Sequence, residues 1–170
     1  MSGNPNSEKT YKLVMTGLMM CLVTMAIMLF KIPVFQGYVH LGNSMMFMAV
    51  MVLGKKNGAI ASGLGAALGD VIGGFAVWAP WSLVVSGGMA LIVGLLMEKN
   101  KKVLGLILGG VFLVAGYYIA EVVIYGNVLA PMAGVPWNIG QYAFGIAIAY
   151  ILTKALCKTP AEKYFAIKAD

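Results

Sequence analysis

The chain has 170 residues, of which 61% are hydrophobic and 11% are charged, and its mean hydropathy is +0.88. This composition excludes an ordinary soluble domain and is typical of an integral membrane protein. The net charge of +6 comes from lysine alone, and the lysines lie between apolar runs, so the charge indicates orientation in a membrane rather than nucleic-acid binding.

Six apolar segments follow one another along the chain, and each has a length and composition that predict one membrane crossing. We expect one membrane domain over residues 1–170, an all-α bundle of six transmembrane helices over about 11–34, 43–53, 58–75, 81–97, 103–125 and 137–156. The second segment is short, so part of the preceding loop over 35–42 is expected to fold into the bundle. Because no soluble domain fits, any ATPase would be a separate chain.

The lysines predict which side of the membrane each connection faces. Six crossings with both termini on one side place eleven of the twelve lysines together, and they leave Lys31 alone near the other side. Positively charged connections stay in the cytoplasm. Both termini are therefore expected to be cytoplasmic.

The third segment combines many small residues with one carboxylate. Small residues recur every fourth position in it, so a helix here would allow neighbouring helices to pack closely. Asp70 then lies inside the bundle, and a carboxylate inside a membrane protein is a functional-site hypothesis by default.

In this topology several polar and aromatic residues converge near the outer leaflet, which predicts one pocket open to the outside and covered by the first loop. The candidate substrate-binding residues are Gln36, Tyr38, His40, Asn43, Asp70, Trp78, Trp81, Tyr117, Glu121, Asn138 and Gln141.

Each candidate also has a plainer interpretation. Asp70 and Glu121 could be structural carboxylates hydrogen-bonded between helices, and the tryptophans could belong to the aromatic belt at the membrane surface. His40 could equally be an exposed loop residue. With one histidine and no cysteine beside it, no metal site is expected. The sequence has no nucleophile–base pair, Walker motif or HExxH, so we expect neither an enzyme nor a bound cofactor.

Several short motifs occur in a characteristic order. They are residues 12–18 leading to Lys31-Ile-Pro33, Gly37-Tyr38 with Leu41-Gly42-Asn43, Gly54 to Gly58, Leu68-Gly69-Asp70 and Ala79-Pro80-Trp81. Together with the six segments and the small size, they resemble the substrate-binding S components of energy-coupling factor (ECF) vitamin transporters.

The resemblance implies a capture subunit in a prokaryotic plasma membrane, without an ATPase of its own. Its partners would be a scaffold membrane subunit and two cytoplasmic ATPases, which use the ATP. The scaffold-docking face of the first span usually has alanine at two positions four residues apart; here Gly17 and Cys21 occupy them.

The substrate follows less directly from the sequence. Two carboxylates near tryptophans favour a small neutral or cationic nitrogen heterocycle, so we expect hydroxymethylpyrimidine or a vitamin B6 vitamer. Alternatives are a riboflavin or pantothenate S component, a stand-alone transporter, a membrane enzyme or a structural subunit.

Overall fold

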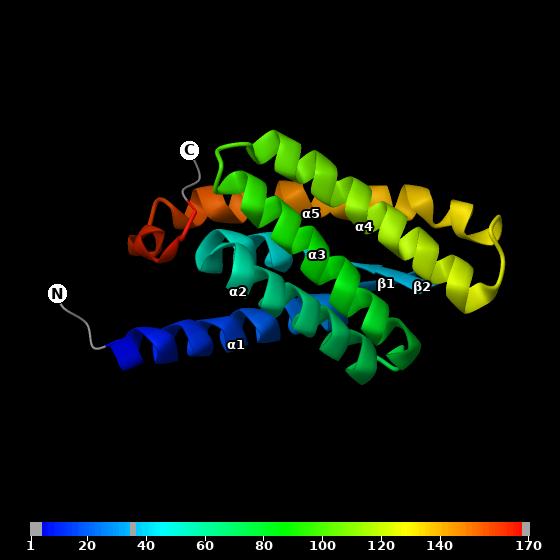
Figure 1. Cartoon of the computed structure of the whole chain (residues 1–170), viewed down its shortest axis with the longest axis horizontal. Coiled ribbons are helices and arrows are strands. Elements are labelled where there is room, and N and C mark those ends of the chain that lie inside the picture. The colour runs from blue at the N-terminus through cyan, green and yellow to red at the C-terminus, as the bar shows by residue number, and fades with distance from the viewer. Residues whose placement is uncertain (1–4, 35–36, 168–170) are drawn as a thin grey trace.

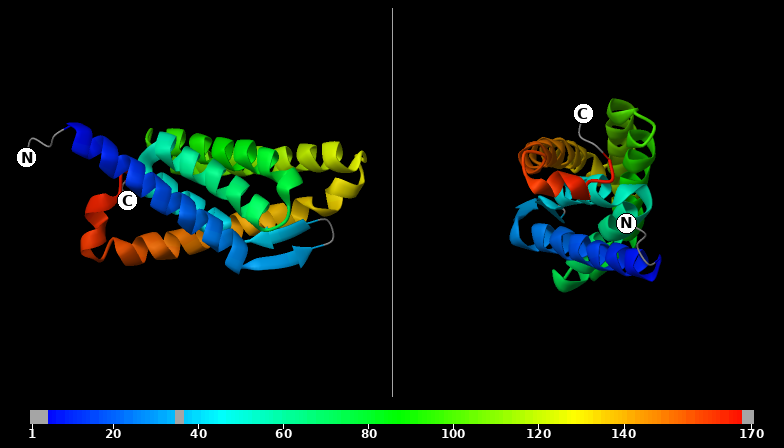
Figure 2. Two further views of the ribbon diagram at one scale, coloured as in Figure 1. Left: turned by 90° about the horizontal axis from the view of Figure 1, so that it is seen from below. Right: turned by 90° about the vertical axis from the view of Figure 1, so that its left-hand side faces the viewer.

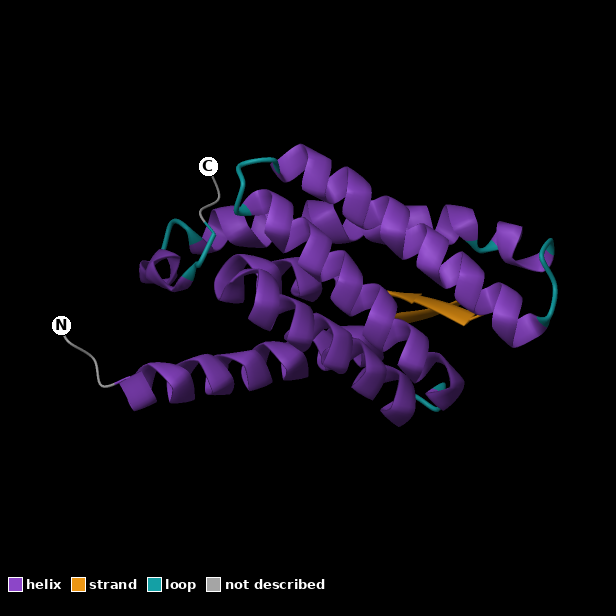
Figure 3. Ribbon diagram, in the orientation of Figure 1, coloured by secondary structure: helices purple, strands orange, loops and turns teal. Residues whose placement is uncertain are grey.

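The computed structural model describes residues 5–34 and 37–167, which form a bundle of helices with one β-hairpin (Figures 1 and 3). In chain order, the elements are α1 (Pro5–Leu29), β1 (Lys31–Val34), β2 (Gly37–His40), α2 (Gly42–Ile72), η1 (Ala76–Trp78), α3 (Ala79–Met97), α4 (Lys102–Tyr125), η2 (Ala130–Ala133), α5 (Val135–Leu156) and η3 (Pro160–Tyr164), where η denotes a short 3-10 helix.

The number of helices differs from the prediction. The described residues form five α-helices rather than six, and four helical segments are long and apolar enough to cross a membrane. The expected second and third crossings are joined in α2, which continues through residues 54–57 without an intervening loop.

A sharp reversal at Gly54 explains how α2 combines both segments. Gly54 has φ 74° and ψ −178°, a conformation that glycine adopts without a Cβ clash. A methyl group on Gly58 would lie 2.7 Å from Val50 Cα, although eight residues of straight helix span about 12 Å. The arms over 42–53 and 55–72 therefore pack side by side, and both ends of α2 lie at the same end of the bundle (Figure 2).

The glycines of α2 bring its second arm into close contact with two neighbouring helices, as the small-residue pattern predicts. A methyl group on Gly63 would lie 2.7 Å from the Leu83 carbonyl oxygen of α3, and one on Gly65 would lie 2.8 Å from the Met20 carbonyl oxygen of α1. Backbone approach of this kind is typical of helix contacts in membranes.

The first predicted span and the loop after it also need correction. The span was expected to continue to residue 34, but α1 ends at Leu29 and residues 31–34 form strand β1. β1 pairs with β2 in antiparallel register, with Lys31 opposite His40. β-branched residues such as Ile32 and Val39 favour this extended pairing over helix.

The helix starts differ by a few residues from those expected. α1 begins at Pro5 rather than at residue 11, and α3 begins at Ala79 rather than at residue 81, with Pro80 accommodated in its first turn. The third expected span ends at Ile72 rather than at residue 75.

The core of the bundle is mostly apolar, with Met46, Met89 and Leu113 fully buried, and many large apolar side chains are also exposed, as expected for a protein surrounded by lipid. Val103 on α4 and Ile151 on α5 are 72% and 64% exposed. The buried polar or charged side chains among the described residues are Asn43, Ser44, Ser62, Asp70, Ser82, Ser86, Glu121 and Thr153.

The connections fall at two opposite ends of the bundle (Figure 1). The bend of α2, the α3–α4 connection and the end of α5 lie at one end, which we call the lysine-rich end because Lys55, Lys56, Lys99, Lys101 and Lys102 are there. The β-hairpin, η1 and η2 lie towards the other end, here called the site end.

An ion pair and a backbone hydrogen bond join the connections at the lysine-rich end. Lys55 Nζ lies 2.7 Å from Glu98 Oε2, and the Lys55 N–H donates to Glu98 Oε1 at 3.2 Å. The hydrogen bonds from Lys55 hold the pKa of the Glu98 carboxyl below its ordinary value. The Ile167 N–H donates to the Met51 carbonyl at 3.0 Å, so the chain after η3 packs onto the bend of α2.

Candidate substrate site

Tyr117 of α4 lies at the centre of a hydrogen-bonded and aromatic group at the site end. Its hydroxyl donates to Ser82 Oγ at 3.2 Å and lies 3.3 Å from Ser86 Oγ, and both serines come from α3. Its ring lies 6.4 Å from that of Trp78, whose ring lies 6.2 Å from that of Tyr125. This group places flat aromatic faces beside bonded hydroxyls.

Asp70 adds a carboxylate to the same group. It is 4% exposed near the end of the second arm of α2, and it interacts electrostatically with Tyr117. Because an isolated charge is costly inside a bilayer, a carboxylate in this position favours a cationic or hydrogen-bond-donating neighbour.

Glu121 lies one helical turn beyond Tyr117 on α4 and faces α5. Its carboxylate is 6% exposed and lies beside the Asn138 side chain of α5. Within the described part of the chain, the second oxygen, Oε2, has no hydrogen-bond partner. A methyl group on Gly134 would lie 2.9 Å from Oε2, so a glycine here leaves room for the carboxylate.

The β-hairpin meets α5 at Gln141. The His40 N–H donates to Gln141 Oε1 at 2.8 Å, and His40 Nδ1 accepts from the Gly42 N–H at 3.0 Å. Asn43 follows at the start of α2; it is 1% exposed and packs against Gly145 of α5. Among the described residues, its Nδ2 has no acceptor.

These contacts place the candidate residues in separate groups at the site end, which are Trp78, Asp70 and Tyr117; Glu121 and Asn138; and His40 and Gln141. α4 presents Tyr117 and Glu121 four residues apart, and α5 presents Asn138 and Gln141 three residues apart, spacings that place each pair on one helix face. The reversal at Gly54 brings the two ends of α2 to this same end of the bundle.

Three candidates remain outside this set of contacts. Gln36 lies outside the described residues. Tyr38 is described only by its backbone, which pairs with Pro33 in the hairpin. Trp81 is half-buried in the first turn of α3, and its role in binding stays a prediction.

The structure adds Ser82, Ser86 and Gly134 to the site. The two serines are four residues apart, so their spacing alone predicts a common helix face, and a polar pair on an otherwise apolar helix is a signal of function. The contact of Gly134 with Glu121 depends on how η2 folds back onto α4, and no local pattern shows it.

The expected docking face on α1 is open in the described structure. A methyl group on Gly17 would meet nothing within 4 Å, and Cys21 is exposed. The adjoining side of α1 packs on α2, where Val23 and Ile27 are buried and the Thr24 hydroxyl donates to the Gly65 carbonyl.

Comparison with known proteins identifies the family. A family model described as "ECF-type riboflavin transporter, S component" matches residues 7–158. The chain belongs to this family. Its members are transporter subunits and are not themselves enzymes, and this S component is a multi-pass membrane protein.

Two curated proteins are similar to this S component. The thiamine precursor transporter HmpT of Lactococcus lactis subsp. cremoris is 33% identical over 113 residues, which are 66% of this chain and 66% of HmpT. An uncharacterised protein of Pyrococcus woesei is 37% identical over 110 residues, 61% of this chain and 74% of that protein. The family and HmpT support a subunit that binds a vitamin or a vitamin precursor.

Proposed function

We propose that this S component captures a small nitrogen heterocycle, hydroxymethylpyrimidine or a vitamin B6 vitamer, from outside the cell. The observation that carries the proposal is the group formed by Trp78, Tyr117 and Asp70 beside the Glu121–Asn138 pair. Aromatic faces suit a flat ring, and buried carboxylates suit amino groups or protonated ring nitrogens.

Two buried polar atoms refine the ligand class. Glu121 Oε2 is an acceptor and Asn43 Nδ2 is a donor, and each is without a hydrogen-bond partner among the described residues. Buried polar groups are normally hydrogen-bonded, so a ligand with both an N–H donor and a ring-nitrogen or hydroxyl acceptor would satisfy them. Hydroxymethylpyrimidine has both kinds of group.

Riboflavin is the second candidate. It is favoured by the description of the family, whereas the name of HmpT favours a thiamine precursor. The two differ greatly in size, so direct binding measurements separate them.

Titration of the purified protein tests the substrate. Hydroxymethylpyrimidine, pyridoxine, riboflavin and pantothenate would be compared by calorimetry and by thermal stabilisation, since a ligand of the folded state raises apparent stability by mass action. We expect one pyrimidine or pyridine compound to bind, Trp78→Ala to abolish binding, and Trp137→Ala, which changes a tryptophan that is 54% exposed, to preserve it. Riboflavin binding alone would replace our substrate, and a folded protein that binds none of the four would contradict vitamin capture.

We also propose that the chain crosses the membrane six times in a prokaryotic plasma membrane, with the two arms of α2 as separate crossings and both termini in the cytoplasm. The concentration of lysines at one end of the bundle supports this orientation. Cysteine labelling from outside tests it: a cysteine introduced at Lys99 should be protected in intact cells, and one introduced at Asn127 should be labelled.

The partners would be an ECF scaffold subunit and two ATPases, with the scaffold contacting α1 at Gly17 and Cys21. The open surface at both positions supports this docking face. Gly17→Trp should preserve vitamin binding but abolish ATP-dependent uptake and co-purification of the scaffold. Gly140→Trp is the matched control, because a side chain at Gly140 also meets nothing within 4 Å. Equal effects of the two substitutions would contradict docking through α1.

A further inference from the structure

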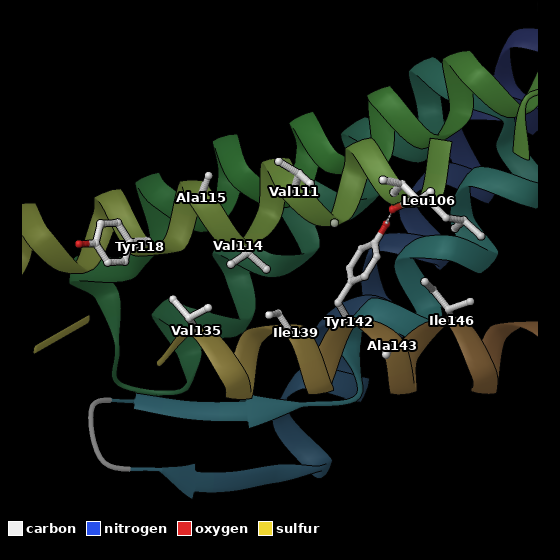
Figure 4. Close-up of a pocket in the computed structure, with 12 residues that line it drawn as sticks. Leu106, Val111, Val114, Ala115, Tyr118, Val135, Ile139, Tyr142, Ala143 and Ile146 are labelled. Carbon is white, nitrogen blue, oxygen red and sulfur yellow. Dashed lines mark hydrogen bonds between the residues drawn. The ribbon is translucent and has the colours of Figure 1, made fainter. Parts of the chain in front are cut away.

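An apolar groove runs between α4 and α5 on the outer surface of the bundle (Figure 4). Its volume is about 620 Å³, and its walls are formed by aliphatic and aromatic side chains. The hydroxyl groups of Tyr142 and Tyr118 are already bonded, because they donate to the carbonyls of Leu106 and Val128 at 2.7 Å each. The groove therefore presents mostly carbon and is unsuited to a polar vitamin.

Small residues line the groove, which extends along several turns of α4. Gly110 lies against the Tyr142 ring, where a methyl group would come within 2.8 Å of Cε1, and Ala115 and Ala143 leave space along the walls. The α4 side extends from residue 106 to residue 118, about 18 Å of helix. This slightly exceeds one leaflet of the hydrocarbon core, which is about 15 Å thick.

Two lysines of α4 and α5 lie beyond one end of the groove. Lys102 precedes Leu106 by four residues, so it lies on the same face of α4, and Lys154 follows Ala143 by eleven residues, or three turns of α5. Lys154 Nζ lies 3.3 Å from Tyr150 Oη. At the other end, the sequence from 118 to 139 contains no lysine or arginine.

We propose that the groove binds an acyl chain of an anionic phospholipid whose phosphate is held by Lys102 and Lys154. The charge at one end, the carbon walls and the length of about one leaflet match a single lipid molecule. A lysine near the membrane surface strengthens binding of anionic lipid about fivefold, so the pair favours an anionic over a zwitterionic headgroup by about 30-fold.

Native mass spectrometry and thermal stabilisation with dioleoyl phosphatidylglycerol or dioleoyl phosphatidylcholine test the proposal. We expect one phosphatidylglycerol to remain bound and to raise the melting temperature. Val111→Trp, which fills the groove, should remove both effects, whereas Val84→Trp should not. The two valines are matched, because they are 61% and 62% exposed on apolar helix surfaces, and only Val111 lines the groove.

Substitution of the two lysines tests the preference for an anionic headgroup separately from binding to the groove. Replacing Lys102 and Lys154 by glutamine should remove the roughly 30-fold preference for phosphatidylglycerol and retain binding of phosphatidylcholine. The same change at Lys12 and Lys99 should preserve the preference. If Val111→Trp does not fold, Ala115→Leu makes the same test with a smaller side chain.

Three results would overturn the proposal. Phosphatidylglycerol that still binds the groove-filled variant would place the lipid elsewhere. An unchanged lipid preference after loss of Lys102 and Lys154 would contradict the phosphate contact. A dimer that dissociates on Val111→Trp would identify the groove as an interface between two copies of the chain.

Discussion

Replacing Gly134 by alanine tests whether the Glu121 carboxylate binds the substrate. The added methyl group would lie 2.9 Å from Glu121 Oε2 and 3.1 Å from Oε1. Contacts this short force the carboxylate to move by several tenths of an ångström. Gly134 has φ −77° and ψ −25°, which alanine adopts without strain. The methyl group would also lie 3.3 Å from the Pro131 carbonyl oxygen, so its shortest contacts, but not all of them, are with the carboxylate.

The magnitude follows from the contacts of the carboxylate. A hydrogen bond to a charged group contributes about 1.5–3 kcal/mol, which corresponds to about 10-fold to 150-fold in a dissociation constant. If Oε2 accepts a hydrogen bond from the substrate, Gly134→Ala should weaken binding by this factor. Calorimetric titration with the vitamin that binds the wild-type protein measures it directly.

Gly140→Ala, in the helix that begins directly after Gly134, is the control, because its added methyl group meets nothing within 4 Å. It should leave the dissociation constant within about twofold of the original value. A folded Gly134→Ala protein with unchanged affinity would refute the role of Glu121, and equal weakening by both substitutions would indicate a general effect on α5.

Three further substitutions test the packing. Tyr117→Phe should lower the free energy of unfolding by about 1 kcal/mol in a denaturant titration, because it removes the hydroxyl shared with two buried serines; no change would show that these bonds add no stability. Gly63→Leu should destabilise by about 1–3 kcal/mol, because its Cβ would lie 2.7 Å from a backbone carbonyl of α3, and a wild-type melting temperature would contradict the close contact. Because the pKa of Glu98 is lowered in the folded protein, its ionised carboxylate stabilises the fold at pH values above the ordinary pKa of 4.5. This contribution is lost as the pH falls through the lowered pKa. Glu98→Gln should therefore lower the melting temperature slightly at pH 7 and by less at pH 3, since the Lys55 pair is about one-third exposed. An equal difference at both pH values would contradict the ion pair.

The helical class and the position of polar residues towards one end of the bundle could be predicted from the sequence, because both depend on strong local signals; that these residues bind substrate stays a prediction. Long apolar runs mark the helices, and Asp70, Glu121 and Asn138 are conspicuous in such runs. Because successive apolar runs cross the membrane in alternating directions, each end of a run is assigned to the outer or the inner side of the membrane. That is why Glu121 and Asn138, which come from different helices and are in contact, could be expected near one another from the sequence.

The connections were harder to predict, because several conformations satisfy the same local pattern. The polar run after Gly54 is typical of a surface loop, but lysine and asparagine are also compatible with the first turn of a helix. The residues after Leu29 end a helix without indicating which element comes next, and the pairing of β1 with β2 depends on contact between two segments rather than on either alone. The hydrogen bond of His40 to Gln141 likewise depends on where the hairpin lies.

The reversal at Gly54 is the step that connects this fold to its site. Asn43 lies eleven residues before Gly54 and Asp70 lies sixteen residues after it, so the two would be about 40 Å apart on a straight helix. Because the chain folds back at Gly54, the two arms run in opposite directions and both residues reach the site end. One glycine conformation thus brings the Asn43 contact with α5 and the Asp70–Tyr117 interaction to the same end of the bundle.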